Sequence, residues 1–244
     1  DLHLPDSERS VKEEVLDWAL ETAKRLHAER IVGAGDLTAT GSTAAAKRLL
    51  RKLKATGIPY LLTPGNADLR SPVDRAKVTE LLATPVEEEG LVLLDTSRSR
   101  LSEPARALLA KSSPAGVLAV THCPPDIWPE EDRALLEKAF RSGRICKLIA
   151  GHWHIDGSFE RLELVRGLDP DKASGGAPEL VIFDGGEREN IILEDADPRS
   201  WPREEREAFC DRLGCSGMKE PVGVLKRGSE AGMKVFELRF TSPD

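Results

Sequence analysis

The 244-residue sequence has no long hydrophobic run and no excess of basic charge. Its longest apolar runs, residues 91–94 and 116–120, have the length of a strand, whereas a membrane-spanning helix needs about 18–20 residues. The 35 Lys and Arg residues are outnumbered by 42 Asp and Glu residues, which gives a formal charge of −7. This balance weighs against nucleic acid or an anionic membrane as a partner, because both require a basic protein surface. The composition, 32% charged and 40% hydrophobic, is that of a soluble globular protein.

Cysteine and histidine are also scarce. The four cysteines form no Cys-x-x-Cys pair and show no regular spacing; they are Cys123, Cys146, Cys210 and Cys215. In a chain of this length, scattered cysteines are typical of reduced, buried thiols rather than of a disulfide framework. We therefore expect a cytoplasmic location. The printed sequence starts at Asp1, without an initiator methionine, a signal peptide or a strand before it. We expect further residues, including a first strand, upstream of this position.

Helical and strand patterns alternate along most of the sequence. Apolar residues at helical spacing predict helices at residues 8–27, 42–54, 73–82, 103–110 and 130–141. Short apolar runs predict strands at residues 31–32, 59–62, 91–94, 116–121 and 147–150. This alternation is typical of an α/β sheet that helices cover on both faces. Later apolar runs at 162–165, 180–183 and 191–193 have no long helices between them and indicate an antiparallel or mixed region.

The composition changes at residues 195–202, which indicates a linker. It divides the chain into a main domain at 1–195 and a C-terminal tail at 196–244. Within the tail, residues 213–218, 221–231 and 233–238 predict a strand, a helix and a strand. Such a βαβ fragment is similar to one unit of a TIM barrel, but a barrel needs eight units. The favoured interpretation is a small appendage that packs on the main domain.

Seven polar side chains come directly after predicted strands. In chain order they are Asp1, His3, Asp36, Asn66, His122, His152 and His154, the first two after the strand expected upstream. In open α/β sheets, ligands bind beyond the carboxyl ends of the strands. Imidazole and carboxylate together favour Mn, Fe, Co, Ni or Zn, whereas an all-oxygen site favours Mg or Ca. Seven ligands exceed the needs of one tetrahedral ion and indicate two ions that share a carboxylate.

These residues belong to five short motifs: Asp1-Leu2-His3, Gly35-Asp36, Gly65-Asn66-Ala67-Asp68, His122 and Gly151-His152-Trp153-His154. The set and its order resemble the calcineurin-like metallophosphoesterases over about residues 1–193. Each motif alone is weak, but five in order at strand ends are specific. The resemblance implies a four-layer α/β/β/α sandwich, here with a small C-terminal appendage. It also implies a hydrolase that cleaves a phosphodiester or phosphomonoester with two divalent transition-metal ions.

The resemblance further assigns the ligands. One ion would be held by Asp1, His3 and His154, the other by Asn66, His122 and His152, and Asp36 would bridge both. A hydroxide that bridges the ions would attack the phosphorus. Two carboxylates around two divalent ions leave a local positive charge, which attracts a small phosphoester although the whole chain is acidic. The wording Gly35-Asp36-Leu37-Thr38 is similar to that of phosphodiesterases for small or cyclic nucleotides.

Ala67 departs from the family's pattern. Many members have a histidine there, which contacts the phosphate or protonates the leaving oxygen. General acid catalysis typically contributes about 10²–10⁴-fold, so poor leaving groups should be hydrolysed slowly. We assign no catalytic side chain, and Asp68 is only a weak substitute. Two alternatives remain open: a nuclease of the same family, which the acidic charge disfavours, and a catalytically weak metal-binding scaffold that positions or regulates a partner.

Two further residues have simpler interpretations. His27 ends a predicted helix, where a surface position is the default and a cation suits the helix dipole. Trp153 lies between two histidines whose side chains share one face of an extended segment. Its own side chain should therefore point away from them, either to line the pocket or to pack in the core.

Overall fold

The computed structural model describes residues 1–7, 10–84, 86–88, 90–111, 116–172, 177–184 and 187–193, and the backbone of residues 217–224 and 234–239. Its helices are α1 (Val11–Arg25), α2 (Thr43–Thr56), α3 (Arg75–Leu82), α4 (Glu103–Leu109) and α5 (Glu130–Arg141), with short 3-10 turns η1 (Ala67–Leu69) and η2 (Pro125–Ile127). None of the helices in these residues has the length and apolarity needed to cross a membrane.

The main sheet has six strands in the order β3-β4-β5-β6-β8-β7. They are β3 (Glu87–Glu88), β4 (Leu91–Leu94), β5 (Val117–Thr121), β6 (Ile145–Ala150), β7 (Gly157–Ser158) and β8 (Leu162–Leu164). Neighbouring strands from β4 to β8 are parallel, and the two-residue strands β3 and β7 pair antiparallel at the edges. The predicted α/β class is therefore confirmed, and the main sheet is mixed.

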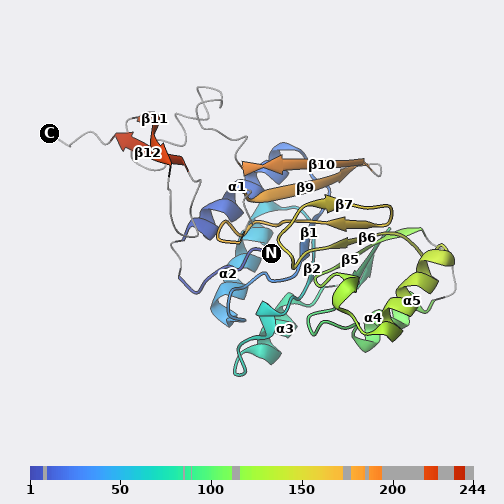
Figure 1. Ribbon diagram of the computed structural model, residues 1–244. Helices are drawn as coiled ribbons and strands as arrows, with labels where there is room; N and C mark the ends of the chain where they lie inside the picture. The colour runs from blue at the N-terminus through green and yellow to red at the C-terminus, as the bar shows by residue number, and fades with distance from the viewer. Residues whose placement is uncertain are drawn as a thin grey trace.

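Two further strand pairs accompany this sheet. Strands β1 (Ile31–Ala34) and β2 (Tyr60–Thr63) pair parallel to each other. Strands β9 (Glu179–Asp184) and β10 (Glu187–Ile192) pair antiparallel. Figure 1 shows α1, α2 and α3 on one side of the strands and α4 and α5 on the other. Within each sheet the parallel pairing places neighbouring carboxyl ends at one edge, those of β1 and β2 in the pair and those of β5 and β6 in the main sheet.

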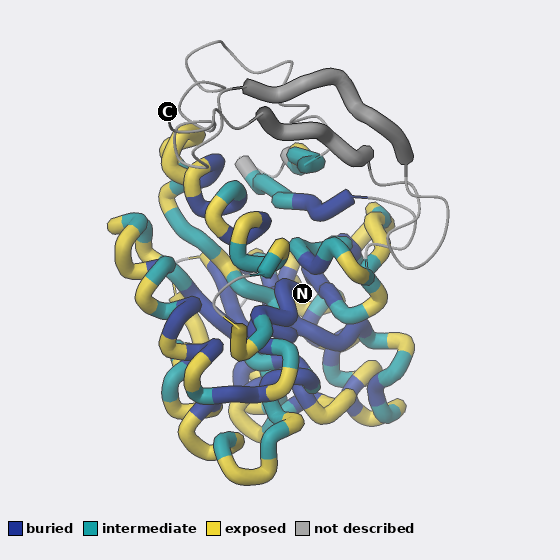
Figure 2. The backbone as a smooth tube through the Cα atoms, turned by 90° about the vertical axis from the view of Figure 1, so that its left-hand side faces the viewer, coloured by how far each residue is buried: buried dark blue, intermediate teal, exposed yellow. Residues whose placement is uncertain are grey.

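Three apolar clusters hold these elements together. On β4, Val92 and Leu94 belong to a cluster with α4 and α5, whereas Leu91 and Leu93 belong to a cluster with Leu61 of β2. This alternation follows from the period of two in a strand, which sends successive side chains to opposite faces. A third cluster joins the apolar faces of α1, α2 and α3 to β2. The buried segments run through the centre of the molecule and include its first residues (Figure 2).

The helices begin where the sequence offers a cap. The side-chain oxygens of Ser10, Ser42 and Ser102 accept hydrogen bonds from the backbone N–H groups three residues on, at the starts of α1, α2 and α4. Helix α2 ends at Gly57, whose φ of 75° is the left-handed conformation that glycine adopts without strain. The predicted helix at 73–82 starts later, at Arg75.

Two predictions differ from the structure. Strands β3 and β7 were not predicted, because each has only two residues and β3 consists of two exposed glutamates with no apolar pattern. In the tail, β11 (Gly217–Val224) and β12 (Lys234–Arg239) pair antiparallel, which a βαβ unit does not allow. Residues 221–224, expected in a helix, belong to β11, and the rest of that expected helix lies outside the described residues. The division of the chain at residue 195 stays a prediction.

A buried carboxylate ties the loop after β1 to the loop after β2. Asp68 is fully buried, and its oxygens accept hydrogen bonds from the backbone N–H groups of Leu37, Thr38 and Gly65 and from the hydroxyl of Thr38. These bonds satisfy backbone donors in both loops. Asp68 is therefore a structural residue that fixes the loops on either side of it.

We expect Asp68→Ala to lower the free energy of unfolding by about 3 kcal/mol, because it leaves several buried N–H groups without an acceptor. Urea denaturation measures this change. Asp17→Ala is the matched control: Asp17 pairs with Lys52 but is about half exposed, and an exposed ion pair contributes about 1 kcal/mol or less. Equal losses for the two variants would contradict the structural role of Asp68.

Candidate metal centre

The structure brings all seven predicted ligands to one place. Asp36, Asn66 and His122 lie in the loops after β1, β2 and β5, and the two histidines of the Gly151 motif lie after β6. Asp1 and His3 join them through the backbone, because the N–H groups of Leu2 and His3 donate to the carbonyl of Asp36. Their assignment as ligands remains a prediction, but the convergence it requires is present.

The Asp1 carboxylate lies among three imidazoles. Its Oδ1 is 3.8 Å from Nε2 of His3, 3.9 Å from Nδ1 of His122 and 3.7 Å from Nε2 of His154. Its Oδ2 accepts a hydrogen bond of 2.7 Å from the backbone N–H of His152. Asp1, His3 and His154 have ligand atoms close enough to hold a metal ion together.

The Asp36 carboxylate lies between the two groups of histidines. Its Oδ2 is 3.3 Å from Nε2 of His3, and its Oδ1 is 3.3 Å from Nε2 of His122. Oδ1 also accepts a hydrogen bond from the backbone N–H of Ala67, which fixes its orientation. Asp36 therefore has the position that a carboxylate shared by two ions requires.

The second group surrounds His122, which is fully buried. Its Nε2 is 3.1 Å from Oδ1 of Asn66 and 3.2 Å from Nδ1 of His152. Asp1, Asp36 and His122 form a further set with ligand atoms close enough to hold an ion. The two groups therefore overlap at their carboxylates.

Unpaired buried atoms show that a cation fits here. Oδ1 of Asp1 and Nδ1 of His154 are buried without a hydrogen-bond partner among the described residues. A buried, unpaired carboxylate oxygen costs free energy unless a cation or donor accompanies it. A divalent ion bound to Asp1, His3 and His154 would compensate this cost.

The backbone of the ligands is strained. His3, Asp36, His152 and His154 all have positive φ, between 49° and 72°, and they are four of the six non-glycine residues with this conformation in the described part of the chain. Such conformations cost roughly 1–3 kcal/mol each and occur mostly at functional sites. Gly151 supplies the space next to them, because a Cβ there would lie 2.5 Å from Oδ2 of Asp1.

The histidines are in their metal-binding form. Burial lowers the pKa of His3 to about 2 and the pKa values of His122 and His154 to about 4, and it also lowers the pKa of His152. All four imidazoles are therefore neutral at physiological pH. Neutral imidazole offers the lone pair that a metal needs.

Two neighbours of the cluster were not singled out from the sequence as site residues. Lys172 places its Nζ 3.0 Å from Nε2 of His3, although it belongs to a loop without a recognisable motif. Burial lowers the pKa of this amine, while the nearby carboxylates of Asp169 and Asp36 act in the opposite direction and favour its charged form. Cys123 groups with His122 and His152, but burial raises the pKa of its thiol, which disfavours the thiolate that binds metals.

No family model matches the chain, and no match to a curated protein was found. Among solved structures, the chain is similar to a dimetal phosphatase from Danio rerio, with 16% sequence identity and a TM-score of 0.40. The similarity covers 63% of this chain and 76% of that chain. A similarity this low does not establish a shared fold.

We expect Asp36→Asn to lose both metal ions, because the variant removes the charge shared by the two groups but keeps an acceptor for Ala67. Dialysis against Mn²⁺ followed by elemental analysis gives the ions bound per chain. The control is His27→Asn: His27 is exposed, is not part of the cluster and has a φ of 54° that asparagine tolerates. Full metal content in Asp36→Asn would overturn the shared-ligand assignment.

The metal-free protein should lose stability as the pH falls from about 6.5 to 4. Unfolded imidazoles titrate near pH 6.5, whereas folded His122 and His154 take up protons only near pH 4. The unfolded state therefore binds more protons in this window, and each such histidine removes up to about 1.4 kcal/mol per pH unit.

Urea denaturation in EDTA at pH 7, 6 and 5 measures this dependence. His122→Asn should show a shallower fall in the free energy of unfolding than the unchanged protein, because one depressed imidazole is gone. Parallel curves for the two proteins would show that His122 does not contribute to the pH dependence.

Proposed function

We propose that this protein is a phosphoester hydrolase that uses two divalent transition-metal ions, as the calcineurin-like metallophosphoesterases do. The observation that carries the proposal is the overlap of two ligand groups at shared carboxylates, with four neutral imidazoles around them. Asp1, His3 and His154 would hold one ion, Asn66, His122 and His152 the other, and Asp36 both. When bound, the ions would supply a nucleophilic water and neutralise the charge that develops on the phosphoryl group.

The chain's own residues would prepare the site for an anion. The two carboxylates do not neutralise two divalent ions, so a phosphate is attracted although the chain carries a charge of −7. Lys172 extends this positive field from beside His3. With His3 bound to a metal, its Nε2 lone pair is taken, and the Lys172 ammonium is available for a phosphate oxygen. A small phosphoester is therefore the proposed substrate class.

Neither residue 67 nor residue 68 would donate a proton to the leaving group. Ala67 is fully buried and offers no proton. The Asp68 carboxylate accepts backbone hydrogen bonds and is fully buried within the loops. Neither residue replaces the histidine that many members of the family have after the asparagine.

We extend the proposal to the layers of the fold and to the location of the protein in the cell. The three apolar clusters lie between α1–α3 and β1–β2, between β2 and the main sheet, and between the main sheet and α4–α5. This succession supports a four-layer α/β/β/α sandwich. Cys123 and Cys146 are free thiols, which is in keeping with a cytoplasmic location.

A metal-binding scaffold without catalysis is the second candidate, and the lack of an acid at position 67 favours it. The two functions differ in turnover. With Mn²⁺, Ni²⁺ or Zn²⁺, we expect hydrolysis of p-nitrophenyl phosphate or bis(p-nitrophenyl) phosphate that Asp36→Asn abolishes and His27→Asn preserves. Metal uptake without hydrolysis of either ester would support the scaffold and overturn the hydrolase.

The hydrolase should be very sensitive to its leaving group. We expect kcat for phenyl esters to be about 10² times or more below kcat for the matched p-nitrophenyl esters, because no side chain at position 67 or 68 protonates the leaving oxygen. Steady-state assays of the two ester series measure the ratio. Similar values for the two series would show that another group acts as the acid.

A further inference from the structure

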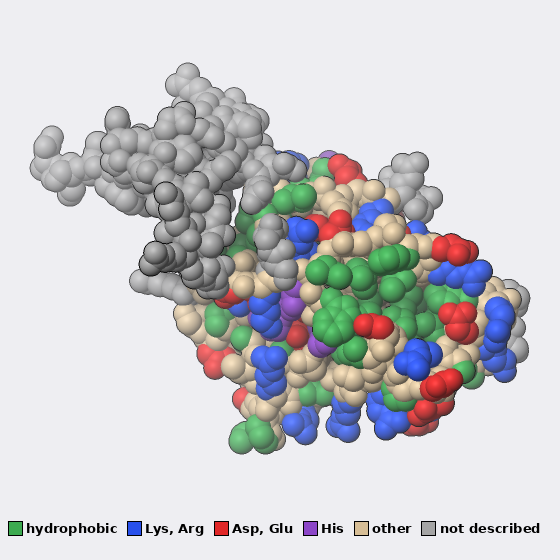
Figure 3. All heavy atoms as spheres, in the orientation of Figure 1, with side chains coloured by type: hydrophobic (Ala, Val, Ile, Leu, Met, Phe, Trp, Pro, Cys, Tyr) green, Lys and Arg blue, Asp and Glu red, His purple; other side chains and the backbone are tan. Residues whose placement is uncertain are grey.

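An apolar pocket lies directly beside the metal centre. It has a volume of about 490 Å³ and is lined by Pro124, Pro125, Asp126, Trp153, Ile155, Phe159, Leu162 and Leu164. Trp153 separates His152 from His154 in the sequence, so the wall of the pocket and the metal ligands share one segment. In Figure 3 the hydrophobic side chains form a patch next to the histidines of the cluster.

Trp153 is the link between pocket and cluster. Its ring centroid is 4.9 Å from that of His152, and its Nε1 donates a 3.4 Å hydrogen bond to Oδ1 of Asp126 on the opposite loop. The indole is therefore fixed at both ends, yet 43% of the residue is exposed. A large aromatic surface held in place but left open to water is typical of a ligand contact.

The other walls continue the same chemistry. Phe159 and Ile155 are also exposed, at 59% and 43%, and two prolines give the rim a rigid, apolar edge. Among the described residues that line the pocket, Asp126 is the one with a charged side chain. Its carboxylate disfavours a second phosphate or another anion at this position and favours a neutral group or a hydrogen-bond donor.

We propose that this pocket binds the organic part of the phosphoester and that it selects a flat aromatic group, such as an aryl ring or a nucleobase. The proposal rests on the proposed function, since the phosphate must lie at the metal centre for the organic part to reach the pocket. Trp153 and Phe159 offer the aromatic surfaces that stack on a flat ring. The volume suits such a group, because ligand pockets are commonly about 300–1,000 Å³.

Three phosphonates that cannot be hydrolysed test the proposal. Phenylphosphonate, methylphosphonate and hexylphosphonate share the metal-binding head and differ in the organic group. Titration calorimetry with the Mn²⁺-loaded protein gives the three dissociation constants. We expect phenylphosphonate to bind about tenfold more tightly than methylphosphonate, since burying a ring in an apolar pocket has about this effect. Hexylphosphonate should bind more weakly than phenylphosphonate.

Two variants address the walls separately. Trp153→Ala should remove most of the preference for phenylphosphonate and leave the affinity for methylphosphonate within about twofold. Phe159→Ala should weaken the same preference from a position outside the ligand segment. The matched control is Val86→Ala, because Val86 is 46% exposed but precedes β3 at the opposite edge of the main sheet. It should change none of the three constants.

The outcomes separate this inference from the proposed function. Equal affinities for the phenyl and methyl compounds, in protein that binds Mn²⁺ and hydrolyses esters, would overturn the pocket and leave the hydrolase intact. Equal affinities for phenyl and hexyl compounds would overturn the selection of a flat group. A protein that takes up no metal and binds no phosphonate would overturn the proposed function and this inference with it.

Discussion

The position of the Asp36 carboxylate is the constraint on which the site depends. Its backbone carbonyl accepts from Leu2 and His3, and its Oδ1 accepts from Ala67. Its two oxygens face His3 on one side and His122 on the other. One residue therefore joins the first segment of the chain to the loops after β1, β2 and β5. The fully buried Asp68 fixes two of these loops, those after β1 and β2, so the geometry of the cluster depends on how these loops are held.

The fold could be predicted from the sequence where a pattern was long and periodic. Helix α5 has the predicted bounds, and α1, α2 and α4 end within a few residues of them, because serine caps and apolar stripes mark them. The central strands were found as short runs of buried Val, Leu and Ile. What failed were elements without such a pattern. The exposed β3 forms by pairing with β4. The antiparallel pairing of β11 with β12 depends on tertiary contacts, which the spacing of apolar residues in the sequence does not reveal.

The site was predictable to the level of which residues meet. Polar residues at the ends of neighbouring parallel strands lie at one edge of a sheet, and the structure brings all seven together although β1–β2 and β5–β6 belong to separate sheets. The sequence contained no signal for the rest. Lys172 comes to His3 from a loop 169 positions away, and the strained φ values of four ligands follow from how the loops close rather than from their composition. Trp153 was expected to point away from both histidines, but its ring centroid lies 4.9 Å from that of His152. Only the structure shows that Ile155, Phe159 and two prolines form a pocket with it.

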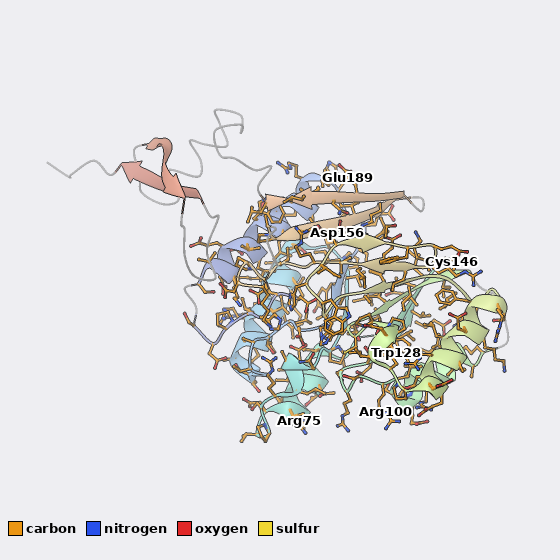
Figure 4. All side chains as sticks on the ribbon, viewed as in Figure 1. Arg75, Arg100, Trp128, Cys146, Asp156 and Glu189 are labelled. Carbon is orange, nitrogen blue, oxygen red and sulfur yellow. The ribbon has the colours of Figure 1, made fainter. Side chains whose placement is uncertain are left out.

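Two surfaces of different polarity therefore lie side by side: the cluster of polar metal-ligand candidates and the apolar pocket. Buried carboxylates and neutral imidazoles lie close enough together to hold cations, and Lys172 lies at the edge of this cluster. Next to it lies a wall of aromatic and aliphatic side chains, to which Asp126 adds a carboxylate. Trp128, labelled in Figure 4 on the α4–α5 side of the sheet, supports this wall from within: its Nε1 donates to the carbonyl of Cys123, directly before Pro124 and Pro125. The same short loop follows His122, so one stretch of the chain contributes both a residue of the cluster and part of the pocket wall.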